Sequence, residues 1–529
     1  MVFTKKIIFI VSLSAFAISA AIFLYSYYFS NPCVIQEIAI TVISQPSCTH
    51  NHHIEPSKNH SVRQEKKEES HCVQRYATAQ DIPRKIKHEK IKYTTPACKQ
   101  KDPLYWDWQT IDTSQLYFPP QFLWGAATSA HQVEGYCTNN EWQLWEENDG
   151  VAPTGKACDH WHRYKEDIQL IKQAGLASYR FSIEWSKIEP APGQFDETAL
   201  KHYEDLCKEL VKQGIKPIVT LHHYTNPLWF YQRGSFEKEE NIHYFINYCV
   251  KVFSRLHPYV HLWLTFNSPT SYAARAYYAQ LAPPGIQNMQ KMQEVLKNVL
   301  EAHVQTYHAL KQLPGGQKSQ IGICHNIYQV EPKHFWDTIS CNTAKALFDD
   351  SVYKFFTTGH FKVSVPLKAN VNHFNATAPR SLDFIGLNYY SHGLMSGFNV
   401  EAYPGDIRTQ NRIYTIYPEG LYRALMEVNN ELTKPLGIPI YITENGIATN
   451  NEEHRKLFFE RYLYALSYAI AQGCPVKGYC VWSLIDNYDW GDYDTPYGIY
   501  AVNFNTLERS KTPRPGAHYF IDTVKKFSN

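Results

Sequence analysis

The feature that most constrains the fold of this chain is an alternation that is repeated eight times after about Tyr117. Short runs rich in β-branched and aromatic residues alternate with stretches in which apolar residues recur three and four positions apart, for example over residues 159–173 and 453–472. The eight runs begin at Phe122, Ser178, Lys216, His261, Gln320, Leu382, Pro439 and Val476. Eight strand–helix units predict an α/β fold, a closed (β/α)8 TIM barrel over residues 117–529.

The composition of the chain fits a packed globular domain. Hydrophobic residues make up 44% and charged residues 19%, which is enough apolar surface to bury a core. The 52 Lys and Arg residues nearly balance the 50 Asp and Glu residues, so the net charge is only +2. Because no chain-wide basic field attracts a polyanion, we expect no nucleic acid partner.

The N-terminal end has the pattern of a membrane segment. Residues 7–29 carry no charge, and a helix of that length spans the roughly 30 Å hydrocarbon core of a bilayer. Lys5 and Lys6 precede the segment, so the positive-inside rule keeps the N-terminus in the cytoplasm. Residues 1–30 are therefore predicted to form a single-pass anchor with the barrel outside the cytoplasm. A cleaved signal peptide, which would give a secreted protein, is the alternative.

Residues 31–116 differ in character from the barrel. Between Glu55 and Asp102 there are 12 Lys or Arg and 7 Asp or Glu residues with few large apolar ones, so this stretch predicts a disordered stalk. Cys48, His50, His52 and His53 lie close together just before this stretch, but their spacing matches no common metal site. We expect no metal and no organic cofactor, and the oligomeric state stays open.

Polar residues close several of the predicted strands. In a TIM barrel the active site is built at the carboxyl ends of the strands, so the candidates are His223, Asn267, Asn388, Tyr390, Glu444 and Trp482. Gln132 and the aromatic residues Trp124, Trp185, Trp263 and Trp490 are expected on the same rim. Aromatic faces together with neutral hydrogen-bonding groups suit a sugar better than a phosphate or a nucleotide.

The ordered motifs of the barrel resemble glycoside hydrolase family 1, the β-glucosidase family. FLWGAATSAHQVEG begins at Phe122, and YRFSIEWSKIEP, LHHYTNP, LTFNSP, DFIGLNYY, YITENG and WSLIDNYDW follow in the family's order. The resemblance implies that Glu444 is the nucleophile of a retaining β-glycosidase and that Arg180, Asn388 and Tyr390 orient it. It also implies a sugar site formed by Gln132, His223, Asn267, Trp482, Asp489 and Trp490, and a small β-glycoside or oligosaccharide as substrate.

The sequence departs from this family at the second catalytic position. The family pattern T-F-N-E-P reads here as Thr265 to Pro269 with Ser268 in place of the acid/base glutamate. A serine hydroxyl cannot supply a proton near neutral pH, so turnover of ordinary glycosides is expected to be poor. Two hypotheses follow: an impaired β-glucosidase-like hydrolase that uses Glu444, or an inactive carbohydrate- or protein-binding pseudoenzyme displayed at the membrane.

A second departure concerns the sugar itself. Asp489 stands where the family usually has a glutamate before Trp490, so the preference for the glycone is open. The 6-phosphosugar enzymes of the family carry a serine there, followed by a phosphate-binding lysine, which this chain lacks. Asp489 and Asp492 would also repel a phosphate, so a phosphorylated glycone is not expected.

Overall fold

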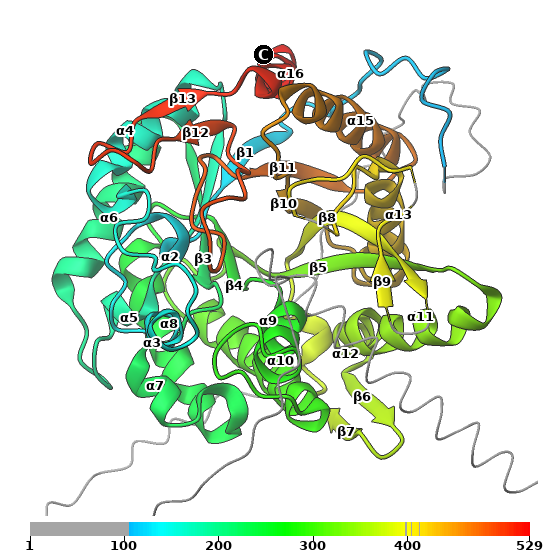
Figure 1. Cartoon of the computed structure of the whole chain (residues 1–529). Coiled ribbons are helices and arrows are strands. Elements are labelled where there is room, and N and C mark those ends of the chain that lie inside the picture. The colour runs from blue at the N-terminus through cyan, green and yellow to red at the C-terminus, as the bar shows by residue number, and fades with distance from the viewer. Residues whose placement is uncertain (1–104, 397–398, 404, 412, 529) are drawn as a thin grey trace, which may run out of the picture. The chain divides into compact units, whose positions relative to one another are not determined.

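The computed structural model describes residues 105–528 except 397–398, 404 and 412, and its centre is a closed parallel barrel (Figure 1). Each strand pairs with the next along the chain, and the last pairs with the first. The eight strands are β1 (Leu123–Ala127), β2 (Ser178–Ser182), β3 (Lys216–His222), β4 (Leu262–Phe266), β5 (Gln320–Pro332), β8 (Phe384–Ser396), β10 (Ile440–Asn445) and β11 (Val476–Trp482). The eight predicted strands and the TIM-barrel fold are confirmed.

Helices surround the barrel and cover the outer faces of its strands (Figure 1). The long ones are α4 (His160–Gln173), α6 (Glu197–Lys212), α8 (Ile242–Leu256), α10 (Met289–Lys311), α13 (Pro418–Val428), α15 (Glu452–Ala471) and α16 (His518–Phe527). Shorter ones on loops include α2 (Ala130–Val133), α3 (Glu141–Asn148), α5 (Trp185–Ile188), α7 (Leu228–Gln232), α9 (Pro269–Tyr277), α11 (Thr338–Lys345) and α12 (Ser351–Thr358). The helices expected over 159–173 and 453–472 correspond to α4 and α15.

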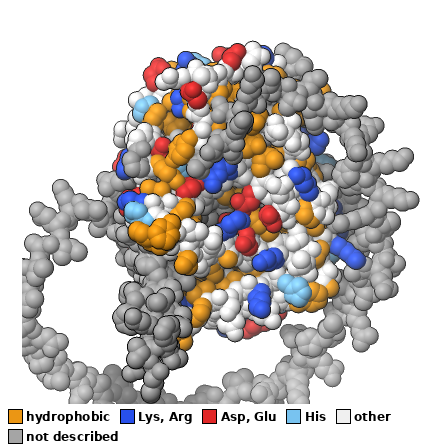
Figure 2. Space-filling view, turned by 90° about the vertical axis from the view of Figure 1, so that its right-hand side faces the viewer, with side chains coloured by type: hydrophobic (Ala, Val, Ile, Leu, Met, Phe, Trp, Pro, Cys, Tyr) orange, Lys and Arg blue, Asp and Glu red, His pale blue; other side chains and the backbone are white. Residues whose placement is uncertain are grey.

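Two strands run past the barrel and carry additional structure. β5 and β8 stay paired up to Pro332 and Met395, and the end of β8 pairs antiparallel with β9 (Asn399–Glu401). A separate hairpin, β6 (His360–Val365) and β7 (Ala369–Phe374), follows α12, and β12 (Tyr500–Val502) pairs with β13 (Lys511–Pro513). On the face shown in Figure 2, basic and acidic side chains are interspersed, in keeping with the small net charge.

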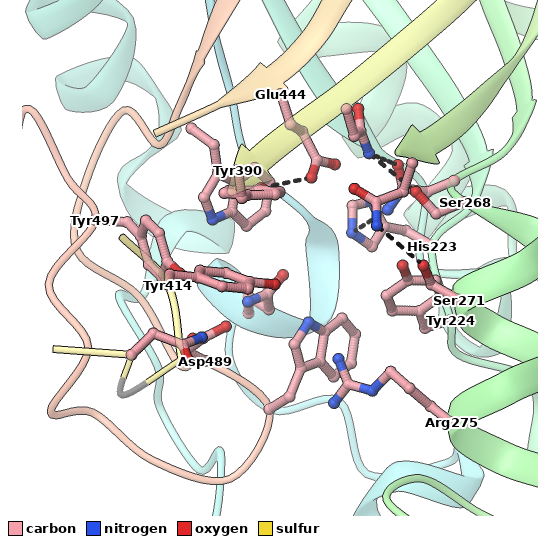
Figure 3. A pocket seen from close by; sticks show the side chains of 17 residues that line it. His223, Tyr224, Ser268, Ser271, Arg275, Tyr390, Tyr414, Glu444, Asp489 and Tyr497 are labelled. Carbon is pink, nitrogen blue, oxygen red and sulfur yellow. Dashed lines mark hydrogen bonds between the residues drawn. The ribbon is translucent and has the colours of Figure 1, made fainter. Parts of the chain in front are cut away.

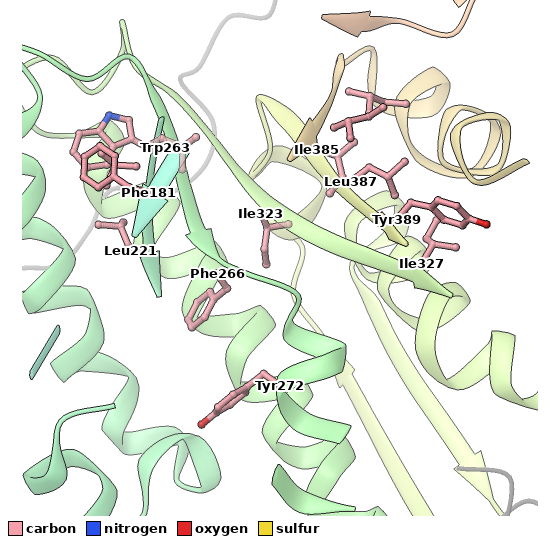
Figure 4. Close-up of a cluster of buried hydrophobic side chains, with 14 of the residues drawn as sticks. Phe181, Leu221, Trp263, Phe266, Tyr272, Ile323, Ile327, Ile385, Leu387 and Tyr389 are labelled. Carbon is pink, nitrogen blue, oxygen red and sulfur yellow. The ribbon is translucent and has the colours of Figure 1, made fainter. Parts of the chain in front are cut away.

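Three of the tryptophans expected at the rim belong to the core instead. Trp124, Trp185 and Trp263 are at most 1% exposed, and none lines the pocket at the barrel mouth. Trp263, for example, belongs to the cluster of buried hydrophobic side chains in Figure 4, and its ring centroid lies 4.9 Å from that of Phe253 of α8. Side chains alternate between the two faces of a strand, and those on the outer face of a barrel meet the helices. The prediction that Trp124, Trp185 and Trp263 lie at the rim of the pocket was therefore wrong.

The segment before the barrel also differs from expectation. Residues 105–116 fall on the stalk side of the predicted boundary, yet Trp106 is 5% exposed and packs edge-on against Tyr464 of α15. The Trp106 backbone N–H and the Trp108 indole N–H both donate to Glu419 of α13, at 2.9 and 2.8 Å. Burial of these rings repays the entropy of ordering the segment, so the folded unit begins by residue 105.

The predicted anchor and nearly all of the predicted stalk lie outside the described residues. None of the helices between residues 105 and 528, the gaps aside, combines the length and the apolar character that a bilayer span requires. Cys207, Cys249 and Cys324 are buried free thiols, and each is surrounded by core side chains.

Candidate active site

One pocket at the barrel mouth brings the sequence-predicted polar residues together (Figure 3). Its walls include Gln132, His223, Asn267, Ser268, Asn388, Tyr390, Glu444, Trp482, Asp489 and Trp490. Arg180 lies beneath them and reaches the pocket through its contact with Glu444.

Glu444 is the carboxylate at the floor of the pocket, one residue before β10 ends. Arg180 donates from Nη1 to its Oε1 at 2.5 Å, and the Tyr390 hydroxyl donates to its Oε2 at 2.7 Å. Burial raises the pKa of Tyr390 well above its ordinary value, so the phenol keeps the proton that it donates. Each carboxylate oxygen therefore has one strong partner that fixes the orientation of the group.

A chain of amide contacts extends from Arg180 to the opposite wall. Asn267 Oδ1 accepts from Arg180 Nη2 at 2.8 Å and from Asn388 Nδ2 at 2.9 Å. Asn388 also donates to the Ser268 hydroxyl at 3.0 Å, and its own Oδ1 accepts from Thr443 at 2.6 Å. These side chains come from β2, β8 and β10 and from the two residues that follow β4, so the barrel itself holds the network rigid.

His223 offers a neutral imidazole at the side of the pocket. Its Nε2 accepts from Asn267 Nδ2 at 3.1 Å, because the Asn267 oxygen is already occupied as an acceptor. Burial and the nearby Arg180 lower the pKa of His223 well below its ordinary value. The ring proton therefore lies on Nδ1, which has no hydrogen-bond partner among the described residues.

Tryptophan rings and an amide complete the sugar-sized part of the pocket. Trp482 and Trp490 both lie nearly parallel to the His223 ring, at 5.9 and 6.1 Å between centroids. Gln132 accepts from Ser129 at 2.6 Å and donates to the backbone of Tyr488 at 2.8 Å. Flat rings next to amides match the C–H faces and hydroxyls of a sugar.

Ser268 caps the start of α9 on the wall across from Glu444 (Figure 3). Its backbone has φ 44°, the left-handed region that non-glycine residues adopt at a cost. Tyr224 lies beside Ser268 and Ser271 on this wall (Figure 3), and burial raises its pKa to about 12. A hydroxyl and a phenol of that pKa give this wall no group that can release a proton near pH 7.

Asp489 is a second carboxyl group that lines the pocket. It lies on the opposite side of the pocket from Ser268 (Figure 3) and accepts a hydrogen bond from Thr495 at 3.0 Å. Burial, followed by the nearby Asp492, raises the pKa of Asp489 to about 7. A carboxyl in that position can bind a sugar hydroxyl, and it is remote from the Ser268 wall (Figure 3).

The sequence interpretation missed several residues of the pocket, of which Arg275 is the most important. Tyr224, Ser271, Asn326 and Asn411 also line it. The signal was present in the sequence: Ser268, Ser271 and Arg275 are spaced i, i+3 and i+7, which places them on one face of a helix. Because Ser268 was expected at the barrel mouth, Ser271 and Arg275 on the same helix face could also have been expected to line the pocket.

One buried group of side chains near the pocket could in principle hold a metal ion. Single ligand atoms of His131, Cys137 and Glu184 lie within 4.8 Å of one another. Both nitrogens of His131 already contact other side chains, Asn140 at one and Glu146 at the other. Lys187 also lies close to the Cys137 thiol, and this cation opposes binding of another.

Comparisons with known proteins identify the family of this chain. The model of glycosyl hydrolase family 1 matches residues 114–528. The chain is 29% identical to β-glucosidase A of Acetivibrio thermocellus over 462 residues, which cover 78% of this chain and 99% of that protein. The 6-phospho-β-galactosidase of Streptococcus mutans is also 29% identical, over 76% of this chain and 97% of the enzyme.

Solved structures show the same relationship. The β-glycosidase from Pyrococcus horikoshii superposes with a TM-score of 0.70 at 33% identity, covering 78% of this chain and 98% of that one. The β-glucosidase from Exiguobacterium antarcticum superposes with a TM-score of 0.72 at 29% identity, with coverage of 78% and 98%. From the barrel, the pocket and these matches together, the chain is a β-glycosidase-like member of glycosyl hydrolase family 1.

Proposed function

We propose that this protein cleaves small β-glycosides or oligosaccharides by a retaining mechanism in which Glu444 is the nucleophile. The observation that carries the proposal is the pair of contacts on its carboxylate, one from Arg180 and one from Tyr390. A carboxylate that is anchored at both oxygens and open to a sugar-sized pocket is arranged to attack an anomeric carbon. Structural glutamates need no such exposure to a pocket.

The reaction has two displacements at the same carbon. In the first, a Glu444 oxygen forms a bond to C1 of the sugar while the bond from C1 to the aglycone oxygen breaks, and the aglycone leaves with that electron pair. In the second, water attacks C1, the bond to Glu444 breaks, and the proton of the water passes to solvent or to an added base. Two inversions give net retention of configuration.

Ser268 restricts the substrates that can react at a useful rate. Loss of a positioned acid/base group costs about 10²- to 10⁴-fold in rate. The penalty is smallest for an aglycone that is stable as an anion, because it needs no proton to leave. The proposed substrates are therefore β-glycosides with acidic leaving groups, and ordinary alkyl glycosides should turn over slowly.

A binding function is the second candidate, and Ser268 is the observation that favours it. An inactive carbohydrate- or protein-binding barrel needs no acid/base group. Against it stand Arg180 and Tyr390, which serve to orient a nucleophile rather than to hold a ligand. In either case, residues 7–29 are proposed to tether the barrel at the outer surface of a membrane, or to be removed from a secreted form.

The deciding experiment uses 2,4-dinitrophenyl β-glucoside, whose leaving group departs without a proton. We expect a burst of dinitrophenol followed by slow turnover, and added azide should accelerate the slow phase because it attacks C1 without needing a base. The glycosyl azide product should have the β configuration. Absence of phenol release while glucose still binds in calorimetry would favour the binding function.

A further inference from the structure

The wall of the pocket across from Glu444 contains a cationic side chain, Arg275, that has neither an ion-pair partner nor a full set of hydrogen bonds among the described residues. Arg275, on the second turn of α9, lines the pocket beside Tyr224 (Figure 3). Its Nε and Nη2 atoms are shielded from solvent and have no hydrogen-bond partner among the described residues. Buried donors of this kind are almost always satisfied in folded proteins, and a buried charge most of all.

Two aromatic rings hold the guanidinium in place. Its central carbon lies 5.9 Å from the centroid of the Tyr224 ring and 5.8 Å from that of Trp490. Such contacts stabilise the charge of an arginine and fix its position, but they use none of its N–H donors. Burial lowers the pKa of Arg275 from its ordinary value, although an arginine stays protonated at neutral pH.

Asp489 is the candidate counter-ion of Arg275, but the Nε and Nη2 atoms of Arg275 still have no hydrogen-bond partner among the described residues. Its carboxylate attracts Arg275 across the pocket but forms no ion pair with it among the described residues. Since burial and Asp492 raise the pKa of Asp489 to about 7, a part of this carboxyl is neutral at physiological pH. The guanidinium is therefore left with donors for a ligand.

Arg275 lies on the side of the pocket where the leaving group must be. In a retaining mechanism the nucleophile attacks C1 from one face, and the aglycone departs from the other. Glu444 marks the first face, whereas Ser268, Tyr224 and Arg275 mark the second (Figure 3). We infer that the aglycone site binds an anionic oxygen group, a carboxylate, sulfate or sulfonate, through the guanidinium of Arg275, with the hydroxyl groups of Ser271 and Tyr224 beside it.

This inference rests on the proposed function, which it narrows to β-glycosides with an acidic aglycone. Ser268 and Arg275 both favour an aglycone that leaves as an anion. Ser268 removes the proton donor, so the aglycone must leave as an anion, and Arg275 adds a positive charge on the side where that negative charge develops. A free small anion could occupy the same place, so the experiment has to separate these two sources.

The test measures binding without catalysis. The ligands are 4-carboxyphenyl β-thioglucoside and its neutral 4-carbamoylphenyl analogue, which are similar in size and carry a sulfur linkage that resists hydrolysis. We expect the intact protein to bind the carboxylate at least about tenfold more tightly in calorimetry, the gain typical of one charge-assisted hydrogen bond. In Arg275→Met the preference should disappear, and in Arg275→Lys it should survive in part.

A matched control removes an arginine that also lies over a tyrosine ring but outside the pocket. Arg233 is 5.5 Å from the ring centroid of Tyr244, and Arg233→Gln should keep the carboxylate preference. Equal affinity for the two thioglucosides, binding of neither, or a preference that persists in Arg275→Met would overturn the inference. Folding of Arg275→Met is checked by its thermal unfolding and by its binding of the carbamoyl ligand.

A third arm identifies the source of the anion. Sodium sulfate is titrated alone into the intact protein and into Arg275→Met. Weak or absent sulfate binding together with the carboxylate preference assigns the site to an acidic aglycone, whereas tight sulfate binding that depends on Arg275 assigns it to a free anion. Dinitrophenol release is scored separately, so a barrel that discriminates the thioglucosides but releases no phenol would fail as a hydrolase and keep its anion site.

Discussion

The two walls of the pocket differ in how completely their polar groups are matched. On the Glu444 wall both carboxylate oxygens are hydrogen-bonded, and the amides behind them form a continuous network. On the Ser268 wall the side chain across from Glu444 is a hydroxyl, and Arg275 has two buried donor atoms without a partner among the described residues. We call the Glu444 wall complete because its polar groups are hydrogen-bonded to one another, and the Ser268 wall incomplete because Arg275 has donors left for a ligand. Substitutions on the two walls should therefore have different effects on activity and binding.

The largest effect should come from the complete wall. Glu444→Gln removes the carboxylate that is proposed to form the glycosyl-enzyme, and the rate of dinitrophenol release should fall by about 10⁴-fold or more. The measurement is the burst phase with 2,4-dinitrophenyl β-glucoside. The exposed glutamate Glu431 provides the control, because Glu431→Gln should leave the burst unchanged. An undiminished burst in Glu444→Gln would refute the assignment.

Restoring the incomplete wall should have the next largest effect. In Ser268→Glu a carboxyl returns across from Glu444, and hydrolysis of 4-nitrophenyl and alkyl β-glucosides should rise by about 10²- to 10⁴-fold. The azide acceleration should disappear at the same time, since the new group activates water. Ser268→Gln has the same shape without the acid, and a similar gain in this variant would mean that the missing proton is not the defect.

A smaller loss is expected when one contact of the complete wall is removed. Tyr390→Phe deletes the hydrogen bond to Glu444 Oε2, and glycosylation should slow by about ten- to a hundredfold, the value of one hydrogen bond to a charged group. Single-turnover release of dinitrophenol measures this step. Tyr497 packs edge-on against Tyr390, and Tyr497→Phe should change the step far less because no contact to Glu444 is lost.

The smallest effect concerns the pH dependence of stability. Because the pKa of Asp489 is raised to about 7 in the folded protein, its ionisation opposes folding, and stability falls as the pH rises from about 4 to 7. Asp489→Asn removes this dependence, so the variant should gain roughly 1 kcal/mol over the parent at pH 8 relative to pH 5, a value reduced to allow for solvent screening. Thermal unfolding at the two pH values measures it, and a larger gain at pH 5 would contradict the sign.

The sequence predicted the parts of this molecule that local periodicity determines. Each barrel strand is a short apolar run between helical patterns, so its position was readable, and polar residues at the strand ends fell at the mouth. Trp124 and Trp263 were misplaced because an apolar run does not state which of its alternating side chains face outward. That choice depends on the register of the closed barrel.

Two other features escaped because they depend on contacts between distant segments. The helical spacing places Arg275 on the same face as Ser268, but only the structure shows that the rings of Tyr224 and Trp490 lie against its guanidinium. Trp106 follows a long charged stretch, and its partners Glu419 and Tyr464 are more than three hundred residues away. Local sequence patterns do not predict contacts between residues that are this far apart in the chain.

The docking of Trp106 has a mechanical consequence. Any tension on the chain before Tyr105 enters the barrel through the Trp106 ring and the two hydrogen bonds to Glu419, on the flank formed by α13 and α15. The load is taken up by helix packing on the outside of the barrel rather than by the loops that hold Ser268 and Asp489. Force on the chain before Tyr105 is therefore not transmitted directly to the residues of the pocket.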